Sequence, residues 1–109
     1  MDFKEYQEKA RSIAVYPNIG DNLSYPSLGL AGEAGEVCEK VKKLYRDDEG
    51  ILSNERRDAI KKELGDVLWY VANVAAECKL EMCDIAQANI DKLFSRKERG
   101  VLKGSGDNR

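Results

Sequence analysis

The chain has 109 residues, of which 42% are hydrophobic and 35% are charged, and its formal net charge is −2. This balance of charge gives no electrostatic footprint for nucleic acid, and no apolar run approaches the roughly 20 residues that span a bilayer. We therefore expect one cytoplasmic domain, residues 1–109, with no signal peptide, no nucleic-acid partner and no membrane partner.

The chain contains no histidine and three cysteines. The lack of histidine excludes Ser-His-Asp and Cys-His catalysis, His-liganded zinc and the helical di-iron sites that need Glu-x-x-His. Any bound metal must then be held by oxygen, which favours Mg²⁺ or Mn²⁺. The cysteines, Cys38, Cys78 and Cys83, have no paired spacing, and we expect them to be small buried thiols.

Apolar residues at helical spacing begin close to the N-terminus. Phe3, Tyr6, Ala10 and Ile13 recur at intervals of three and four residues and predict a first helix over residues 2–16. Pro17 ends this pattern, and a run of turn-forming residues then predicts a loop as far as residue 26.

Three further helices follow in chain order. The second is expected to begin between Ser24 and Ser27 and to end near Arg46, and the third to cover about 54–78 with Ser53 or Asn54 as its N-cap. The fourth covers about 82–97, and the glycine-rich tail that begins at Gly100 cannot continue it. No strand pattern occurs, so the sequence predicts an all-α protein with a non-helical C-terminal tail.

Two segments, 30 residues apart, share the pattern Glu-x-Gly-acid-Val: Glu33–Val37 in the second helix and Glu63–Val67 in the third. On a helical wheel, both place two carboxylates about 40° and 100° from the valine of the packing stripe, on the same flank. If the stripes pack antiparallel, four acids converge at the edge of the core: Glu33, Glu36, Glu63 and Asp66. The alternative is that they are ordinary surface acids.

Four converging carboxylates raise each other's pKa and weaken the fold unless a divalent cation offsets their charge. Other residues on the same flank have two interpretations each. Lys40 and Lys43 either meet phosphate oxygens or line a solvated face, and Tyr70 either borders a base or belongs to the core. Gly29 and Gly32 leave room for a ligand or for close helix packing.

The acidic motifs resemble those of the MazG-like nucleoside triphosphate pyrophosphohydrolases, members of the all-α NTP pyrophosphatase superfamily. The resemblance covers about residues 24–97 and rests on two runs, Gly-Leu-Ala-Gly-Glu-Ala-Gly-Glu-Val and Glu-Leu-Gly-Asp-Val-Leu-Trp-Tyr. It implies a four-helix bundle completed by assembly into a homodimer or homotetramer. It also implies Mg²⁺-dependent cleavage of nucleoside triphosphates between the α- and β-phosphates, with Mn²⁺ as a substitute, in the control of nucleotide pools.

The resemblance also assigns residues. It maps the catalytic metal ligands onto Glu33, Glu36, Glu63 and Asp66, while Gly32 stands where members often carry a further Glu, so the number of metals and the base stay open. Asn89 interrupts the apolar stripe of the fourth helix, and a buried amide there needs a partner. The expected substrate contacts, besides the two lysines, are Tyr70, Asn89, Lys92, Lys103 and Arg109, the last two in a tail that is otherwise frayed or placed on a neighbouring subunit.

Two alternatives remain open at this point. One is a specialised relative that acts on dUTP, dCTP or phosphoribosyl-ATP. The short linker between the second and third helices favours the simpler MazG-like type over such a relative. The other is a non-catalytic helical interaction module with vestigial or structural acids, against which the four intact carboxylates argue.

Overall fold

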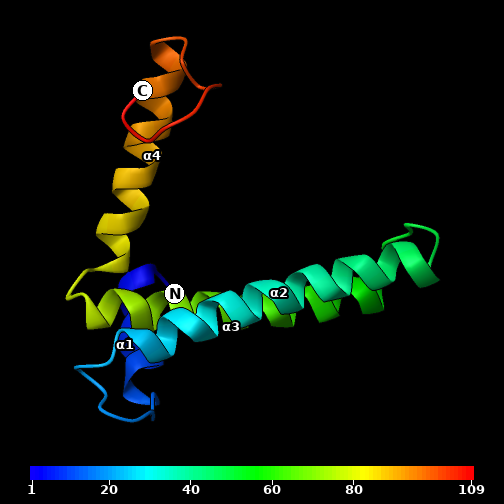
Figure 1. Cartoon of the computed structure of the whole chain (residues 1–109), viewed down its shortest axis with the longest axis horizontal. Helices are drawn as coiled ribbons and strands as arrows, with labels where there is room; N and C mark the ends of the chain where they lie inside the picture. Colours follow the sequence, from blue (N-terminus) through cyan, green and yellow to red (C-terminus); the bar gives the residue numbers. More distant parts are fainter.

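The computed structural model describes residues 1–109, which form four α-helices and no strand. The helices are α1 (Phe3–Ser12), α2 (Ser24–Asp47), α3 (Asn54–Glu77) and α4 (Met82–Glu98). Helices α2 and α3 form a long antiparallel hairpin, α1 crosses α3 near the end of the hairpin, and α4 projects away from it (Figure 1). The predicted all-α fold is confirmed.

Short-range hydrogen bonds set where the helices begin. The Asp2 carboxylate accepts from the Glu5 N–H at 2.8 Å at the start of α1, and the Ser53 hydroxyl accepts from the Arg56 N–H at 3.2 Å at the start of α3. Ser53, and not Asn54, is therefore the N-cap of α3, in the role that a serine side chain plays best.

Helix α1 is shorter than the sequence predicts, because it ends at Ser12 and not near Tyr16. The Tyr16 ring stacks on Tyr25 with centroids 4.9 Å apart, and its hydroxyl donates to Glu77 at 2.6 Å. The chain must leave the helix early to bury Tyr16 in this position. Tertiary contacts thus override the local helical pattern.

The core is small and lies where α1 crosses α3 and meets the start of α4. Four buried side chains form it: Ala10, Ala72, Ala75 and Met82. Partly buried apolar side chains pack against these four, namely Tyr6, Leu68, Trp69 and Val71. Only ten of the 109 residues are buried, so most apolar side chains on the helices keep contact with solvent.

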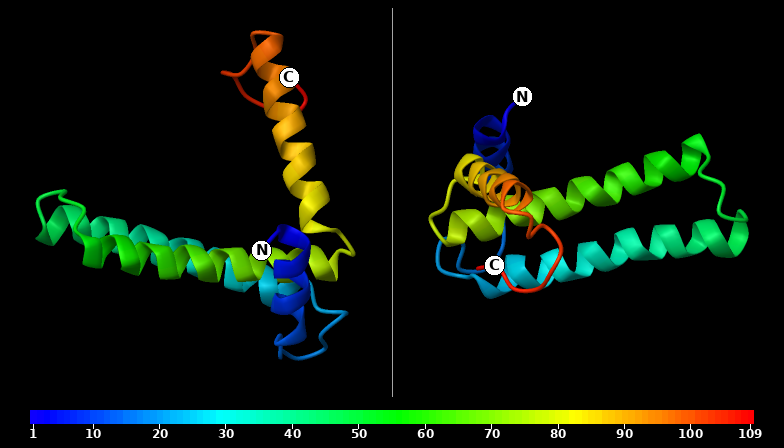
Figure 2. Two further views of the ribbon diagram at one scale, coloured as in Figure 1. Left: turned by 180° about the vertical axis from the view of Figure 1, so that it is seen from behind. Right: turned by 90° about the horizontal axis from the view of Figure 1, so that it is seen from above.

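The molecule has an open, angular outline (Figure 2). Its radius of gyration is 16.7 Å, against about 13 Å for a compact chain of this length. Its accessible surface is 7879 Å², against roughly 6,000 Å² for a typical folded monomer of this mass. The chain thus exposes about 1,900 Å² more than a compact monomer would.

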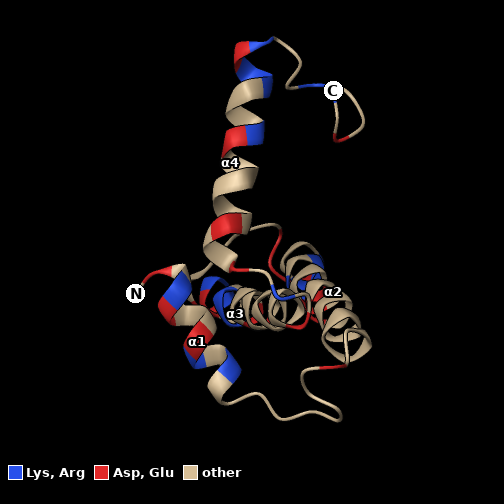
Figure 3. Cartoon of the chain, turned by 90° about the vertical axis from the view of Figure 1, so that its left-hand side faces the viewer, with Lys and Arg blue, Asp and Glu red and all other residues tan.

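The apolar stripe of α4 is uncovered over most of its length. Ile85, Ile90, Leu93 and Phe94 are exposed, and only Met82 at the start of the helix is buried. Figure 3 shows α4 standing clear of the hairpin, with an uncharged stretch between its acidic residues. The four helices therefore do not close into a bundle within one chain. No helix combines the length and apolarity needed to cross a membrane.

All three cysteines are exposed, so the expectation of buried thiols is wrong. Cys38 lies in α2, Cys78 is the C-cap of α3 and Cys83 lies in the first turn of α4. The reason is the small core, which leaves these helical positions without a covering neighbour.

The C-terminal tail is not helical, as expected, but it is folded. It turns back on the last turns of α4 and is closed by arginine bonds to main-chain oxygens. Arg109 donates to the carbonyls of Val101 at 3.2 Å and Leu102 at 2.9 Å, and Arg99 donates to the carbonyl of Arg109 at 3.0 Å. Arg96 is almost fully buried by the loop and donates to its main chain.

Candidate functional site

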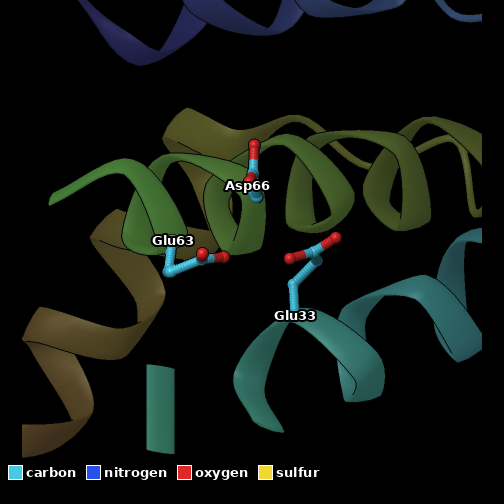
Figure 4. Close-up of side chains that lie close together, drawn as sticks. All are labelled: Glu33, Glu63 and Asp66. Atoms are coloured by element: carbon cyan, nitrogen blue, oxygen red, sulfur yellow. The ribbon is translucent and has the colours of Figure 1, made fainter. Parts of the chain in front are cut away.

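Three acidic side chains meet between α2 and α3 (Figure 4). One carboxylate oxygen from each of Glu33, Glu63 and Asp66 lies within 4.8 Å of the other two. Figure 4 shows Glu33 extending from α2 toward the two acids on α3. Glu33 and Glu63 are half-buried and Asp66 is exposed, so the group has one open side. We call these three residues the carboxylate trio.

Glu36 does not join the trio. It is exposed and lies one turn beyond Glu33 on α2, and its negative charge contributes to the raised pKa of Glu33. The antiparallel hairpin therefore brings together three of the four acids that the sequence pattern singled out. The fourth is close enough to act electrostatically but adds no oxygen to the group.

Burial and the neighbouring acids both act on Glu33. The pKa of Glu33 is raised above its ordinary value, first by burial and then by the charges of Asp66, Glu63 and Glu36 and by a hydrogen bond with Glu63. Burial and the neighbouring acids thus both disfavour the charged form of Glu33, and a divalent cation would offset the repulsion.

The donor set fits a hard divalent cation. All three ligand groups are carboxylates, which Mg²⁺ and Mn²⁺ prefer, and the exposed side at Asp66 leaves space for water or phosphate oxygens. Three acids drawn from two helices, with no histidine or thiol among them, do not suit zinc or copper. Glu33, Glu63 and Asp66 are the residues that would hold the cation.

One lysine contacts the trio directly. Lys40 Nζ lies 3.7 Å from Glu63 Oε1, with the two side chains 29% and 17% exposed. Lys43, one turn further along α2, makes no ion pair with the trio, and its charge acts instead on Glu39 and Asp47.

Tyr70 packs against α2 on the other side of the trio. A Cβ added at Gly29 would overlap the Tyr70 ring, whereas one added at Gly32 would meet nothing within 4 Å. The bare backbone at Gly29 thus makes room for Tyr70 and not for a ligand. The pKa of Tyr70 is raised by burial first, and then by Tyr25 and by the acids Glu33 and Asp66, so its hydroxyl lies close to the trio.

A buried polar network at the C-terminal end of α3, about three turns beyond the trio, is absent from the sequence-based expectations. The Glu77 side chain is 1% exposed and accepts hydrogen bonds from the Tyr16 hydroxyl at 2.6 Å and the Gly20 N–H at 2.9 Å. Arg11 pairs with Glu77 at 3.4 Å and donates to Asn73 at 3.0 Å. The sequence signal was the pair of polar residues at 73 and 77, which lie one turn apart in an apolar segment.

This network fixes the loop between α1 and α2. Because Tyr16 stacks on Tyr25, the network also holds Tyr25 at the end of the hairpin where Tyr70 lies. Trp69 contacts Tyr70 edge-on, with ring centroids 5.1 Å apart. An aromatic group thus borders the trio on the side opposite to Lys40.

The remaining predicted substrate contacts lie on α4 and its tail, away from the trio (Figure 1). Asn89 is exposed, so the expectation of a buried amide is wrong within one chain, because nothing covers the α4 stripe. Lys92 pairs with Asp107 at 3.3 Å, Lys103 is exposed, and Arg109 uses its donors on its own tail.

A surface cavity also lies apart from the trio. It has a volume of about 850 Å³ and lies between α1, the end of α3 and the start of α4. Side chains of both signs line it, including Arg11, Lys79 and Asp84. We base the site on the trio, because converging carboxylates define a chemistry and the cavity does not.

Two comparisons with known proteins each cover most of the chain. A sequence model of the MazG nucleotide pyrophosphohydrolase domain matches residues 24–101. The chain is 50% identical over 109 residues to the Gene 37 protein of Mycobacterium phage L5, covering 95% of this chain and 96% of that protein. No solved structure matches.

Two mammalian proteins are more distant relatives. The chain is 32% identical over 74 residues to dCTP pyrophosphatase 1 of Bos taurus and 34% identical over 74 residues to that of Mus musculus. Each alignment covers 66% of this chain and 42% of the relative, so the chain spans less than half the length of these two proteins.

Proposed function

Because the chain belongs to the MazG nucleotide pyrophosphohydrolase family, we propose that it hydrolyses nucleoside triphosphates between the α- and β-phosphates. The products would be the nucleoside monophosphate and pyrophosphate, and the cellular role would be control of nucleotide pools. The observation that supports this most is the carboxylate trio, which offers three hard oxygen ligands in one place. Mg²⁺ is the proposed cofactor, with Mn²⁺ as a substitute.

The chain's own residues would position the reaction and manage its charges. A bound Mg²⁺ would supply positive charge to the phosphate oxygens and favour ionisation of water. Glu33, Glu63 and Asp66 would hold the cation. Glu36, which adds no oxygen to the trio, would either complete the ligand set or accept the proton of the attacking water, a role that Glu33 also suits.

The order of residues along the hairpin suggests how the substrate would lie. Tyr70 borders the trio at one end, with Tyr25 beyond it, and Lys40 and Lys43 follow the trio at the other end. Aromatic faces stack on bases, and lysine ammonium groups meet phosphate. We therefore place the nucleoside toward Tyr70 and the outer phosphates toward the lysines.

We also propose that the active form is a homodimer or a homotetramer. Two chains that each hide an excess of about 1,900 Å² would bury about 3,800 Å² together, within the range of obligate homodimers. The exposed stripe of α4 supplies an apolar surface for this contact. A second copy is also the means by which Asn89, Lys92 and Lys103 could approach a trio that they do not reach in their own chain.

A product assay tests the proposed reaction. The protein is incubated with each ribo- and deoxyribonucleoside triphosphate, with Mg²⁺, with Mn²⁺ and with a chelator, and the products are separated. Monophosphate and pyrophosphate in equal amounts, only when a cation is present, are the expected result. Diphosphate with phosphate contradicts the proposal, and absence of turnover favours a non-catalytic module.

The mammalian relatives favour one second candidate, a specialised dCTP pyrophosphatase. The same panel separates the two, because a specialised enzyme would prefer dCTP by about 100-fold or more, whereas a general one would vary far less between bases. The panel also includes dUTP and phosphoribosyl-ATP, the substrates of other specialised relatives.

A further inference from the structure

Lys40 is the one cationic residue in an ion pair with the trio. Its Nζ lies 3.7 Å from Glu63 Oε1, and no other lysine or arginine pairs with Glu33, Glu63 or Asp66. Both partners are largely removed from solvent, with 29% and 17% of their side chains exposed. In the cation-free site, this ammonium group supplies the positive charge that the three acids need.

A divalent cation would need the same carboxylate. Glu63 provides one of only three oxygens that converge within 4.8 Å, so a cation held there binds the same carboxylate that now faces Lys40. Two positive groups on one carboxylate repel each other. Lysine can give way, since its charge lies at the end of a flexible four-carbon stem.

The position of Lys40 also determines where it can go. It lies between the trio and Lys43 on α2, on the side of the site that we assign to the outer phosphates. An ammonium group displaced from Glu63 would therefore find phosphate oxygens, which are good acceptors for a charged donor.

We propose that Lys40 exchanges partners when substrate is loaded: it pairs with Glu63 in the cation-free site and with a phosphate oxygen when the cation and nucleotide are bound. This inference rests on the proposed function. Its consequence is that Lys40 opposes cation binding and favours triphosphate binding. A lysine that merely ties α2 to α3 would affect neither in this way.

The test measures both affinities in the Lys40→Gln protein. Mn²⁺ alone is titrated into cation-stripped protein by calorimetry, and binding should tighten by about two- to fivefold, as expected for the loss of one partly exposed ion pair. With saturating cation, KM for the preferred triphosphate should rise by about tenfold, as for the loss of one hydrogen bond to a charged group. Tighter Mn²⁺ binding together with a higher KM for the triphosphate is the result that distinguishes the exchange of partners.

Two further variants serve as controls. Lys43→Gln removes the same charge one turn further along α2, where no ion pair with the trio exists, and should change Mn²⁺ affinity by less than about twofold. Lys40→Arg keeps the positive charge and should bind Mn²⁺ as the wild type does. Circular dichroism checks that all three variants keep their helices.

The outcomes separate the inference from the function on which it rests. Looser Mn²⁺ binding in Lys40→Gln, an equal gain in Lys43→Gln or an unchanged KM each overturn the exchange, while turnover by the wild type leaves the proposed function standing. A wild-type protein that binds no Mn²⁺ and releases no pyrophosphate overturns both.

Discussion

The side chains of Glu33, Glu63 and Asp66 occupy one small volume, and their charges work against folding until a cation joins them. The pKa of Glu33 is raised by burial first and by the charges of its acidic neighbours second. Removing one acid should therefore stabilise the cation-free protein and, at the same time, remove its response to the cation. Function and stability oppose each other at these three positions.

Asp66→Asn tests this opposition. In the presence of a chelator its melting temperature should equal or exceed that of the wild type, because repulsion in the trio is relieved. Added Mg²⁺ should raise the melting temperature of the wild type, since only the folded state gathers the acids, and should leave the variant unchanged. kcat/KM should fall by about 100-fold or more.

Asp58→Asn is the matched control for that measurement. Asp58 lies on the exposed side of α3, outside the trio, and should keep both the Mg²⁺ response and the activity. Glu36→Gln should also lose activity; it should retain much of the Mg²⁺ response if Glu36 accepts the proton of the attacking water, and lose much of it if Glu36 completes the ligand set. A full Mg²⁺ response in Asp66→Asn would contradict the site.

Gly29 and Gly32 differ in what surrounds them, although both lie on the flank of α2 that carries the acids. Gly29→Ala should cost about 1–3 kcal/mol of unfolding free energy, because the methyl group would overlap the Tyr70 ring. Gly32→Ala should gain up to about 1 kcal/mol, because its Cβ meets nothing and alanine favours the helix. Urea denaturation of both proteins measures the difference. Equal effects would show that Tyr70 does not pack on α2 as described.

The elements differ in how far local sequence decides them. The bounds of α2, α3 and α4 agree with the prediction to within one or two residues, because caps and apolar spacing are local properties. The end of α1 could not be predicted, since it depends on Glu77, 61 residues away from Tyr16. Distant partners of this kind leave no periodic trace in a sequence.

The same distinction applies to the site. The 30-residue repeat predicts that two helices present acids on one flank, and the trio agrees with it. Whether the Glu36 carboxylate also reaches the trio depends on the direction in which its side chain leaves the helix, which a helical wheel does not resolve. Asn89 and the thiols were misjudged because burial on α2 and α4 depends on a neighbour that periodicity cannot identify.

The Glu77 side chain joins α1, the following loop and α3, so its replacement tests how these three segments are held together. Its pKa is lowered by the hydrogen bond from Tyr16 first, and then by the N–H groups of Gly20 and Asn22 and by Arg11. Glu77→Gln should lower the unfolding free energy at neutral pH by roughly 1–3 kcal/mol, since buried donors would then face a neutral amide.

The pH dependence of this effect has a definite sign. An acid whose pKa is lower in the folded state stabilises fully above its unfolded pKa, and that stabilisation is lost as the pH falls through the folded value. The gap in unfolding free energy between wild type and Glu77→Gln should therefore be constant from neutral pH down to about 4.5 and narrow below it. Urea denaturation at several pH values checks this, with exposed Glu8→Gln as the control; a gap that widens in acid would contradict the assignment.

At the scale of the whole molecule, the chain is more open than a compact monomer of its length. Four buried apolar side chains form its small core, while apolar residues of α4 face solvent. If a second copy covers α4, stability depends on protein concentration, and the melting temperature rises with it.

Ile90→Asp examines this surface. Light scattering should give a multiple of the chain mass for the wild type and the single chain mass for the variant, because a charge cannot be buried in an apolar contact at acceptable cost. Ala88→Asp adds the same charge on the opposite face of α4 and should stay assembled. A wild type that scatters as a single chain at micromolar concentration would contradict the proposed assembly.

The hairpin also bears on the order of events in folding. Residues 48–53 connect α2 to α3, so the contacts between these helices need only short loop closure and can form in microseconds to milliseconds. If α4 packs on a second copy, as we propose, that contact must wait for an encounter between chains, whose rate depends on the protein concentration. Refolding of this protein is therefore expected to contain a fast step of first order, which builds the hairpin and the trio, and a slower step of second order, which brings α4 of one chain to the site of another.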